Sequence, residues 1–84
     1  MPNEWISVKD RLPDKNGRCL CYVKRLYESH YEILAFAPNL EKIDKHDFRN
    51  VKRGGWYDYV EGYGYMEIRN ITHWMPLPQP PKGE

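Results

Sequence analysis

Residues 71–81 read ITHWMPLPQPP, and the rest of the chain is organised around this stretch. It begins as a strand and continues as an extended arm, because proline fixes φ and lacks the backbone N–H that a helix or a central ladder needs. The large apolar anchors that we assign to the arm are Trp74 and Leu77. We therefore expect the arm, from Pro76 onward, to close a small β-rich core by laying these two anchors over it.

Length and composition indicate one globular domain spanning residues 1–84. The apolar fraction of 40% and the charged fraction of 30% fit this class. Three Trp and seven Tyr are efficient fillers of a thin core, since each large ring buries roughly 150–250 Å². Thirteen basic and twelve acidic residues leave a net charge of +1, which gives no long-range attraction to nucleic acid or to an anionic membrane.

The chain shows no sign of export or of membrane insertion. No apolar run reaches the roughly 18–20 residues that cross a bilayer. The start, MPNEW, has neither the basic nor the apolar region of a signal peptide. We expect a cytoplasmic protein without a membrane partner, in which Cys19 and Cys21 are reduced.

Strands dominate the predicted secondary structure. The expected strands are residues 18–26, 31–37, 56–60 and 65–74. The first two form a hairpin, and the last two form another around Gly62 and Gly64, which supply positive φ. Residues 66 and 68 share a face but Ile71 lies on the other, so we expect either a bulge near Asn70 or coverage on both sides. Residues 39–53 are interpreted as a solvated loop, with a short helix as the alternative.

The fold class is β-rich, either all-β or α+β, with about four antiparallel strands in a small twisted sheet or a partly open barrel. Ser7 and Asp10 have the spacing of a capping box, which predicts a short N-terminal helical turn that Pro13 ends. The proline-rich C-terminal arm completes the domain.

The two ends of the chain carry a pair of distinctive motifs. Their residues are Trp5, Asp10, Leu12 and Pro13 in WISVxDxLP, and His73, Trp74, Pro76, Leu77, Pro78 and Pro81 in THWMPLPxPP. Together these motifs resemble the paired signatures of the Domain of Unknown Function 551 family. The resemblance implies a small accessory protein of bacteriophages, prophages and their host bacteria, and hence a bacterial cytoplasm. It implies no activity and no catalytic residues. We interpret the motif residues as structural, with Trp5 and Trp74 meeting over the open end of the sheet.

Cys19 and Cys21, together with His30, His46 and His73, are a possible metal set, because zinc favours thiolate and imidazole ligands. The histidines are scattered, however, and lack the spacing of a second ligand pair. Two buried free cysteines are the preferred interpretation, with no metal and no cofactor.

His73 would need a positioned partner such as Asp10 or Asp58 to act as an acid or base. No spacing in the sequence guarantees one, so we interpret His73 as a half-buried structural residue that orients Trp74. The sequence also lacks a nucleophile elbow, a P-loop and a dinucleotide fingerprint. We therefore expect no enzymatic activity.

The segment GYGYMEI at residues 62–68 approximates a ribonucleoprotein motif, whose aromatic residues stack on bases. The candidate platform is Tyr57, Tyr59, Tyr63 and Tyr65, with Lys52, Arg53 and Arg69 for phosphates. Glu61 at the leading basic position and Ile68 at the last aromatic position depart from the motif. A tyrosine-rich hairpin with cross-strand ring pairs is the competing interpretation.

The favoured function is a small non-enzymatic protein-interaction module that binds an unknown phage or host protein through an aromatic surface. The predicted surface residues are Tyr57, Tyr59, Tyr63, Tyr65 and His73. The alternative is single-stranded nucleic-acid binding through the Tyr63/Tyr65 hairpin. Residues 78–82, PQPPK, also match a P-x-x-P ligand with a basic flank, although we expect this tail to pack on its own domain.

Overall fold

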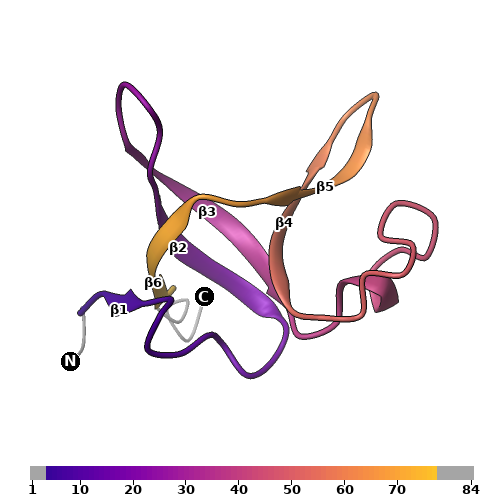
Figure 1. Cartoon of the computed structure of the whole chain (residues 1–84), viewed down its shortest axis with the longest axis horizontal. Coiled ribbons are helices and arrows are strands. Elements are labelled where there is room, and N and C mark those ends of the chain that lie inside the picture. The colour runs from indigo at the N-terminus through magenta and orange to yellow at the C-terminus, as the bar shows by residue number, and fades with distance from the viewer. Residues whose placement is uncertain (1–3, 78–84) are drawn as a thin grey trace, which may run out of the picture.

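Six strands form one open antiparallel sheet in the part of the chain that the computed structural model describes, residues 4–77 (Figure 1). The strands are β1 (Ile6–Ser7), β2 (Gly17–Val23), β3 (His30–Ala37), β4 (Gly55–Val60), β5 (Gly64–Ile68) and β6 (Ile71–Pro76). Their order in the sheet is β1-β6-β2-β3-β4-β5, and a single 3₁₀ turn, η1 (Leu40–Lys42), is the one helical element of the described residues. The predicted β-rich class is confirmed.

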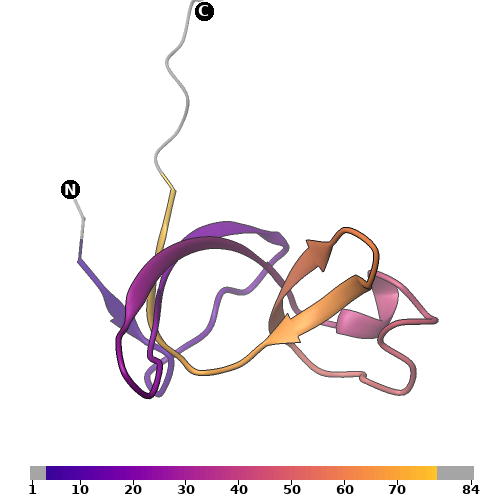
Figure 2. The same ribbon diagram turned by 90° about the horizontal axis from the view of Figure 1, so that it is seen from above.

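The prediction of about four strands is corrected to six, because the strand expected over residues 65–74 is two strands and the N-terminal segment adds β1. Asn70 has a left-handed φ of 68°, which interrupts the extended backbone between Ile68 and Ile71. β5 is therefore the far edge of the sheet, whereas β6 lies between β1 and β2. The sheet curls, so that residues 69 and 70 are enough to connect β5 at the edge with β6 between β1 and β2 (Figures 1 and 2).

The N-terminal segment forms a two-residue strand followed by one hydrogen-bonded turn, and the short helical turn predicted from the capping-box spacing is not confirmed as a helix. Ile6 lies opposite Trp74 and Ser7 opposite His73, and the Val8 N–H donates to the carbonyl of Thr72 at 3.0 Å. This pairing keeps the backbone extended up to Ser7, whose carbonyl then accepts the N–H groups of residues 10 and 11 at 2.9 and 3.2 Å. One turn follows, and no helix.

The proline arm begins later than predicted. Pro76 is the last residue of β6 and lies opposite Cys19, so it still belongs to the sheet. Leu77 follows outside the ladder, and the remainder of the predicted arm, including Pro78 and Pro81, lies outside the described residues.

Residues 39–53 form a loop that begins with η1 and is held by its own hydrogen bonds. Asn39 caps the 3₁₀ turn through its side chain, which accepts the Glu41 N–H at 3.1 Å. The N–H groups of Leu40 and Glu41 donate to the carbonyls of Arg53 and Val51, both at 3.0 Å. The two ends of the segment are thereby tied together beside β4.

The sheet has an inner face, inside the curve, and an outer face. Among the described residues the inner core consists of Cys19, Cys21, Val23, Leu34, Phe36, Trp56, Ile71 and Trp74. A second cluster, of Ala37, Leu40 and Phe48 with Tyr57 and Tyr65 packed against it, lies on the outer face, because neighbouring residues of a strand point to opposite faces. Residues 39–53 thus cover the outer face at β4 and β5 and leave it open elsewhere (Figure 2).

Candidate functional site

Three aromatic rings gather on the open part of the outer face. Tyr22 of β2 lies opposite both Tyr31 of β3 and His73 of β6. Trp5, just before β1, stacks on Tyr31 with ring centroids 5.9 Å apart and packs on Tyr22 at 6.3 Å. Together with His73 these rings line an open cleft of about 300 Å³, which we call the aromatic cleft.

An aliphatic row continues the aromatic cleft along the same strands. Leu20 of β2 lies opposite Ile33 of β3 and Met75 of β6, two positions further along the sheet. Tyr31 is 63% exposed and Ile33 is 46% exposed, so no other part of the described chain covers this area. We call the set Trp5, Leu20, Tyr22, Tyr31, Ile33 and Met75 the uncovered face.

The sequence prediction missed Tyr22, Tyr31 and Ile33 as surface residues. The signal was present in the first hairpin, where residues pair symmetrically about Leu26 and Tyr27 and therefore place Tyr22 opposite Tyr31. The contribution of β6 could not be found this way, because its pairing with β2 joins residues about fifty positions apart in the chain.

His73 belongs to the aromatic cleft and not to the tyrosine hairpin with which it was grouped. Its Nδ1 atom lies 2.9 Å from the hydroxyl of Thr72. Neither of the two proposed acidic partners, Asp10 and Asp58, forms a hydrogen bond with it within residues 4–77. The described structure therefore gives His73 an aromatic setting and a hydroxyl neighbour.

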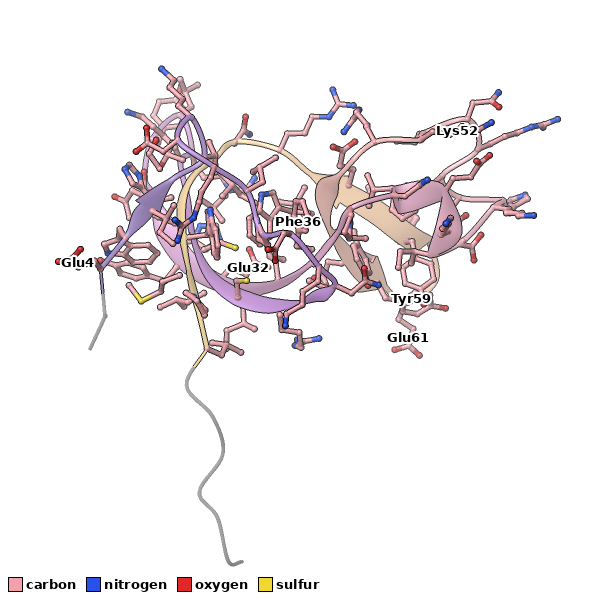
Figure 3. The ribbon with its side chains drawn as sticks, turned by 90° about the horizontal axis from the view of Figure 1, so that it is seen from below. Glu4, Glu32, Phe36, Lys52, Tyr59 and Glu61 are labelled. Atoms are coloured by element: carbon pink, nitrogen blue, oxygen red, sulfur yellow. The ribbon has the colours of Figure 1, made fainter. Side chains whose placement is uncertain are left out.

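The four tyrosines of the predicted platform are divided by the structure. Tyr57 and Tyr65 pack against Phe48, with ring centroids 6.1 and 6.2 Å away, and burial raises the pKa of the Tyr57 phenol. Tyr59 is 59% exposed and Tyr63, in the turn, is 81% exposed. Only these last two present most of their rings to solvent, and Figure 3 shows Tyr59 and Glu61 pointing outward at this end of the molecule.

In residues 39–53 the acidic side chains accept hydrogen bonds from the backbone, whereas the basic side chains are exposed to solvent. Each of the three carboxylates accepts backbone N–H groups: Glu41 from Asn50, Asp44 from two residues of its own turn, and Asp47 from Tyr65. The hydrogen bond from the Tyr65 N–H lowers the pKa of Asp47. The exposed cations of the segment are Lys42, Lys45, Arg49, Lys52 and Arg53, of which Arg53 is ion-paired with Glu67, and Figure 3 shows Lys52 extending from the segment. The surface of this segment is therefore basic.

Two of the three cations assigned to phosphates are engaged within the protein. Arg53 forms a bidentate ion pair with Glu67, with N···O distances of 2.8 and 2.9 Å, and Arg69 lies 3.4 Å from the same carboxylate. The hydrogen bond from Arg53 lowers the pKa of Glu67. The pair fastens the end of the 39–53 segment to β5.

We expect Glu67→Gln to lower the free energy of unfolding by about 1 kcal/mol at pH 7, since bidentate charge-assisted pairs exceed ordinary surface pairs. The pKa of Glu67 is lowered in the folded state, so its contribution is present above the unfolded-state pKa and is lost as the pH falls through the folded-state value. Urea unfolding at pH 7 and at about pH 3 should therefore show the difference between wild type and variant shrinking in acid. The exposed Glu61→Gln variant is the control, and equal losses for both variants would contradict the role of the pair.

The two cysteines and three histidines of the possible metal set do not come together around a common point in the described structure. Cys19 and Cys21 are free and buried, and burial raises the pKa of both thiols, that of Cys21 to about 12. These thiols are thus protonated at neutral pH, whereas a metal needs thiolates. The part of the chain that the structure describes holds no group of three or more His, Cys, Asp or Glu side chains placed around a common point.

None of the helical structure in residues 4–77 has the length and apolar character needed to cross a bilayer.

Comparison with known proteins places the chain among phage proteins. Residues 4–82 match the family model described as a protein of unknown function, DUF551. The chain is 31% identical over 81 residues to the Eaa protein of Salmonella phage P22, an alignment that covers 96% of this chain but 20% of that protein. It is 30% identical over 83 residues to an uncharacterized 7.8 kDa protein of the same phage, from the ral-gp17 intergenic region, covering 93% of this chain and 96% of that protein. No solved structure matches.

Proposed function

The chain belongs to DUF551, a phage-associated family of unknown function, and from this premise we propose that it is a small non-enzymatic module that binds a partner protein on the uncovered face. The partner is a phage or host protein in the bacterial cytoplasm, and the module works without a cofactor. The resemblance drawn from the two terminal motifs is confirmed by the family match, whereas the binding activity is our proposal.

The observation that carries the proposal is the unequal covering of one sheet. On the outer face of β4 and β5, residues 39–53 bury the apolar side chains. On the outer face of β6, β2 and β3, comparable aromatic and aliphatic side chains stay exposed, including Tyr31 and Ile33. A contiguous exposed apolar patch on a small domain is typical of an interaction site, and Trp and Tyr are enriched among the residues that dominate binding.

The lengths of the relatives support a self-sufficient module. The chain spans about a fifth of the Eaa protein and nearly all of the 7.8 kDa protein. The same sequence pattern therefore occurs both as a part of a larger protein and nearly alone. An interaction module suits both contexts, because its surface does not depend on one fixed neighbour.

Affinity capture with a matched pair of variants tests the proposal. Ile33 on the uncovered face and Met66 on β5 are nearly equally exposed, at 46% and 48%. We expect wild type and Met66→Lys to recover the same protein from nuclease-treated lysate of phage-carrying bacteria, identified by mass spectrometry. Ile33→Lys should recover at least about fivefold less of it, because a buried interfacial charge is costly.

A partner that Ile33→Lys retains as well as wild type does would overturn docking on this face. Circular dichroism of the two lysine variants checks that both remain folded, which limits the comparison to the surface.

The alternative, single-stranded nucleic-acid binding, is supported by a different region. Tyr59 and Tyr63 are the exposed rings of the second hairpin, and Asp47 fastens the basic 39–53 segment to Tyr65 on the same hairpin. Exposed rings next to cations suit base stacking and phosphate contact. Nucleic acid that co-purifies and is lost with nuclease, with Tyr59→Ala and Tyr63→Ala reducing it, would favour this function.

A further inference from the structure

We propose that the aromatic cleft binds a proline-rich segment in the polyproline II conformation, and that the segment is residues 78–82 of a second copy of this chain. This inference rests on the proposed function, since it names the kind of partner that the uncovered face accepts. It has three independent supports: the lining of the cleft, the composition of the segment and the direction in which β6 runs.

The lining of the cleft has the chemistry that polyproline segments require. Trp5 and Tyr31 are stacked with an interplanar angle of 15°, and Tyr22 is inclined to them at 62° and 56°, so the rings present both faces and edges. Aromatic-lined grooves of this kind bind proline-rich segments in the polyproline II conformation. A polyproline II helix forms no internal hydrogen bonds and therefore leaves its carbonyls free to accept donors.

Suitable donors stand at the cleft. The indole N–H of Trp5 and the hydroxyls of Tyr22 and Tyr31 make no hydrogen bond within residues 4–77. By contrast, the indole N–H of the buried Trp74 does find a partner, the carbonyl of Arg11 at 3.0 Å. The cleft thus combines apolar rings with donor groups that remain available to a ligand.

The chain itself carries a segment of the matching class. Residues 78–82, directly after the end of the described chain, read PQPPK, with three prolines in five positions. The segment ends in the cation Lys82, and the exposed carboxylate of Glu4 directly precedes Trp5 of the cleft. Figure 3 shows Glu4 at the β1 end of the molecule, so the charges of cleft and segment are complementary.

The direction of β6 favours a second copy over the same chain. β6 passes the cleft at His73 and leaves the sheet at Pro76, moving away from the cleft. A return to the cleft would require an immediate reversal, and a sequence with three prolines in five positions disfavours one, because proline fixes φ and restricts the residue before it. Reciprocal exchange between two copies would give a twofold dimer, and unreciprocated binding would give head-to-tail chains.

Sedimentation velocity of the full chain tests this inference with two variants, one altered in the cleft and the other in the segment. Tyr31→Ala damages the cleft and keeps the segment, whereas a variant with Pro78, Pro80 and Pro81 all changed to Ala damages the segment and keeps the cleft. We expect wild type to associate with rising concentration, and each variant alone to associate at least about tenfold more weakly. A mixture of the two variants should regain a dimer, because one intact cleft then meets one intact segment. Met66→Ala, at a 48% exposed side chain of β5 that belongs to neither the cleft nor the segment, is the control and should behave as wild type.

Three results would overturn the inference: wild type that stays monomeric at all accessible concentrations, association that survives both variants, or a mixture that stays monomeric. If association is lost with Tyr31→Ala but kept by the proline variant, the uncovered face joins two copies without the segment, and the inference is again wrong. The proposed function is tested by a different experiment, in which wild type recovers a foreign protein and Ile33→Lys loses it. The proposed function and this inference can therefore be contradicted separately.

Discussion

Replacing Trp74 by alanine should lower the free energy of unfolding by about 3–5 kcal/mol. The ring is 5% exposed and packs on Trp56, with ring centroids 6.1 Å apart, in the inner core. Its indole N–H also donates to the carbonyl of Arg11 at 3.0 Å and so ties the segment after β1 to β6. Alanine would leave a cavity and an unpaired carbonyl. A domain of this length has about 4–12 kcal/mol in total, so the variant should be near the limit of folding.

Urea unfolding followed by tryptophan fluorescence measures this effect, and Trp5→Ala is the matched control. Trp5 is 37% exposed on the outer face, so its loss should cost about 1–2 kcal/mol. Equal losses for the two variants, or a loss below about 1 kcal/mol for Trp74→Ala, would contradict the assignment of Trp74 to the core and of Trp5 to the surface.

The difference between the two tryptophans shows where the sequence prediction was wrong. The motifs predict that Trp5 and Trp74 meet over the open end of the sheet. Their strands are indeed neighbours, but Ile6 lies opposite Trp74, and Trp5 is one residue away from it. In a strand that one-residue offset reverses the face, so Trp74 enters the inner core and Trp5 joins the aromatic cleft.

Local patterns predicted the hairpins well. The first hairpin was expected at residues 18–26 and 31–37, and the structure pairs β2 with β3 there. The positive φ values expected in the second hairpin are 89° at Gly62 and 96° at Gly64. These features depend on turn residues and on alternation within about ten positions, so the sequence contains them.

The remaining features depend on contacts between distant residues. β1 has two residues, too few for any periodicity, and is a strand because β6 pairs with it. In place of the expected bulge near Asn70, the structure has a break between β5 and β6 at this left-handed residue, and the register shift lies in the pairing of β6 with β2, between Tyr22 and Val23. Neither the order of the strands nor the covering of one half of the outer face has a local signal. The sequence therefore indicates a surface on the second hairpin, whereas the uncovered face lies on β6, β2 and β3, and His73 is the one predicted surface residue that lines the aromatic cleft.

Replacing Phe48 by alanine should also lower the free energy of unfolding by about 3–5 kcal/mol. Phe48 is 3% exposed and packs edge-on against Tyr57 and less regularly against Tyr65, which come from β4 and β5. It is the largest buried side chain that residues 39–53 contribute to the outer cluster. Without it, the polar contacts of Asp47 and Arg53 would hold the segment to β5.

Hydrogen exchange distinguishes loss of this covering from loss of the whole fold. The Tyr65 amide, which donates to Asp47 at 2.9 Å, should lose protection first in Phe48→Ala, while amides between β2 and β3 should change less. Leu26→Ala, at an 86% exposed position, is the control and should change neither stability nor exchange. A loss below about 1 kcal/mol with an unchanged Tyr65 amide would mean that polar contacts alone hold the segment. In the expected case Tyr57 and Tyr65 become exposed together, and the hairpin gains the aromatic platform that its sequence predicts but that the covering segment withholds.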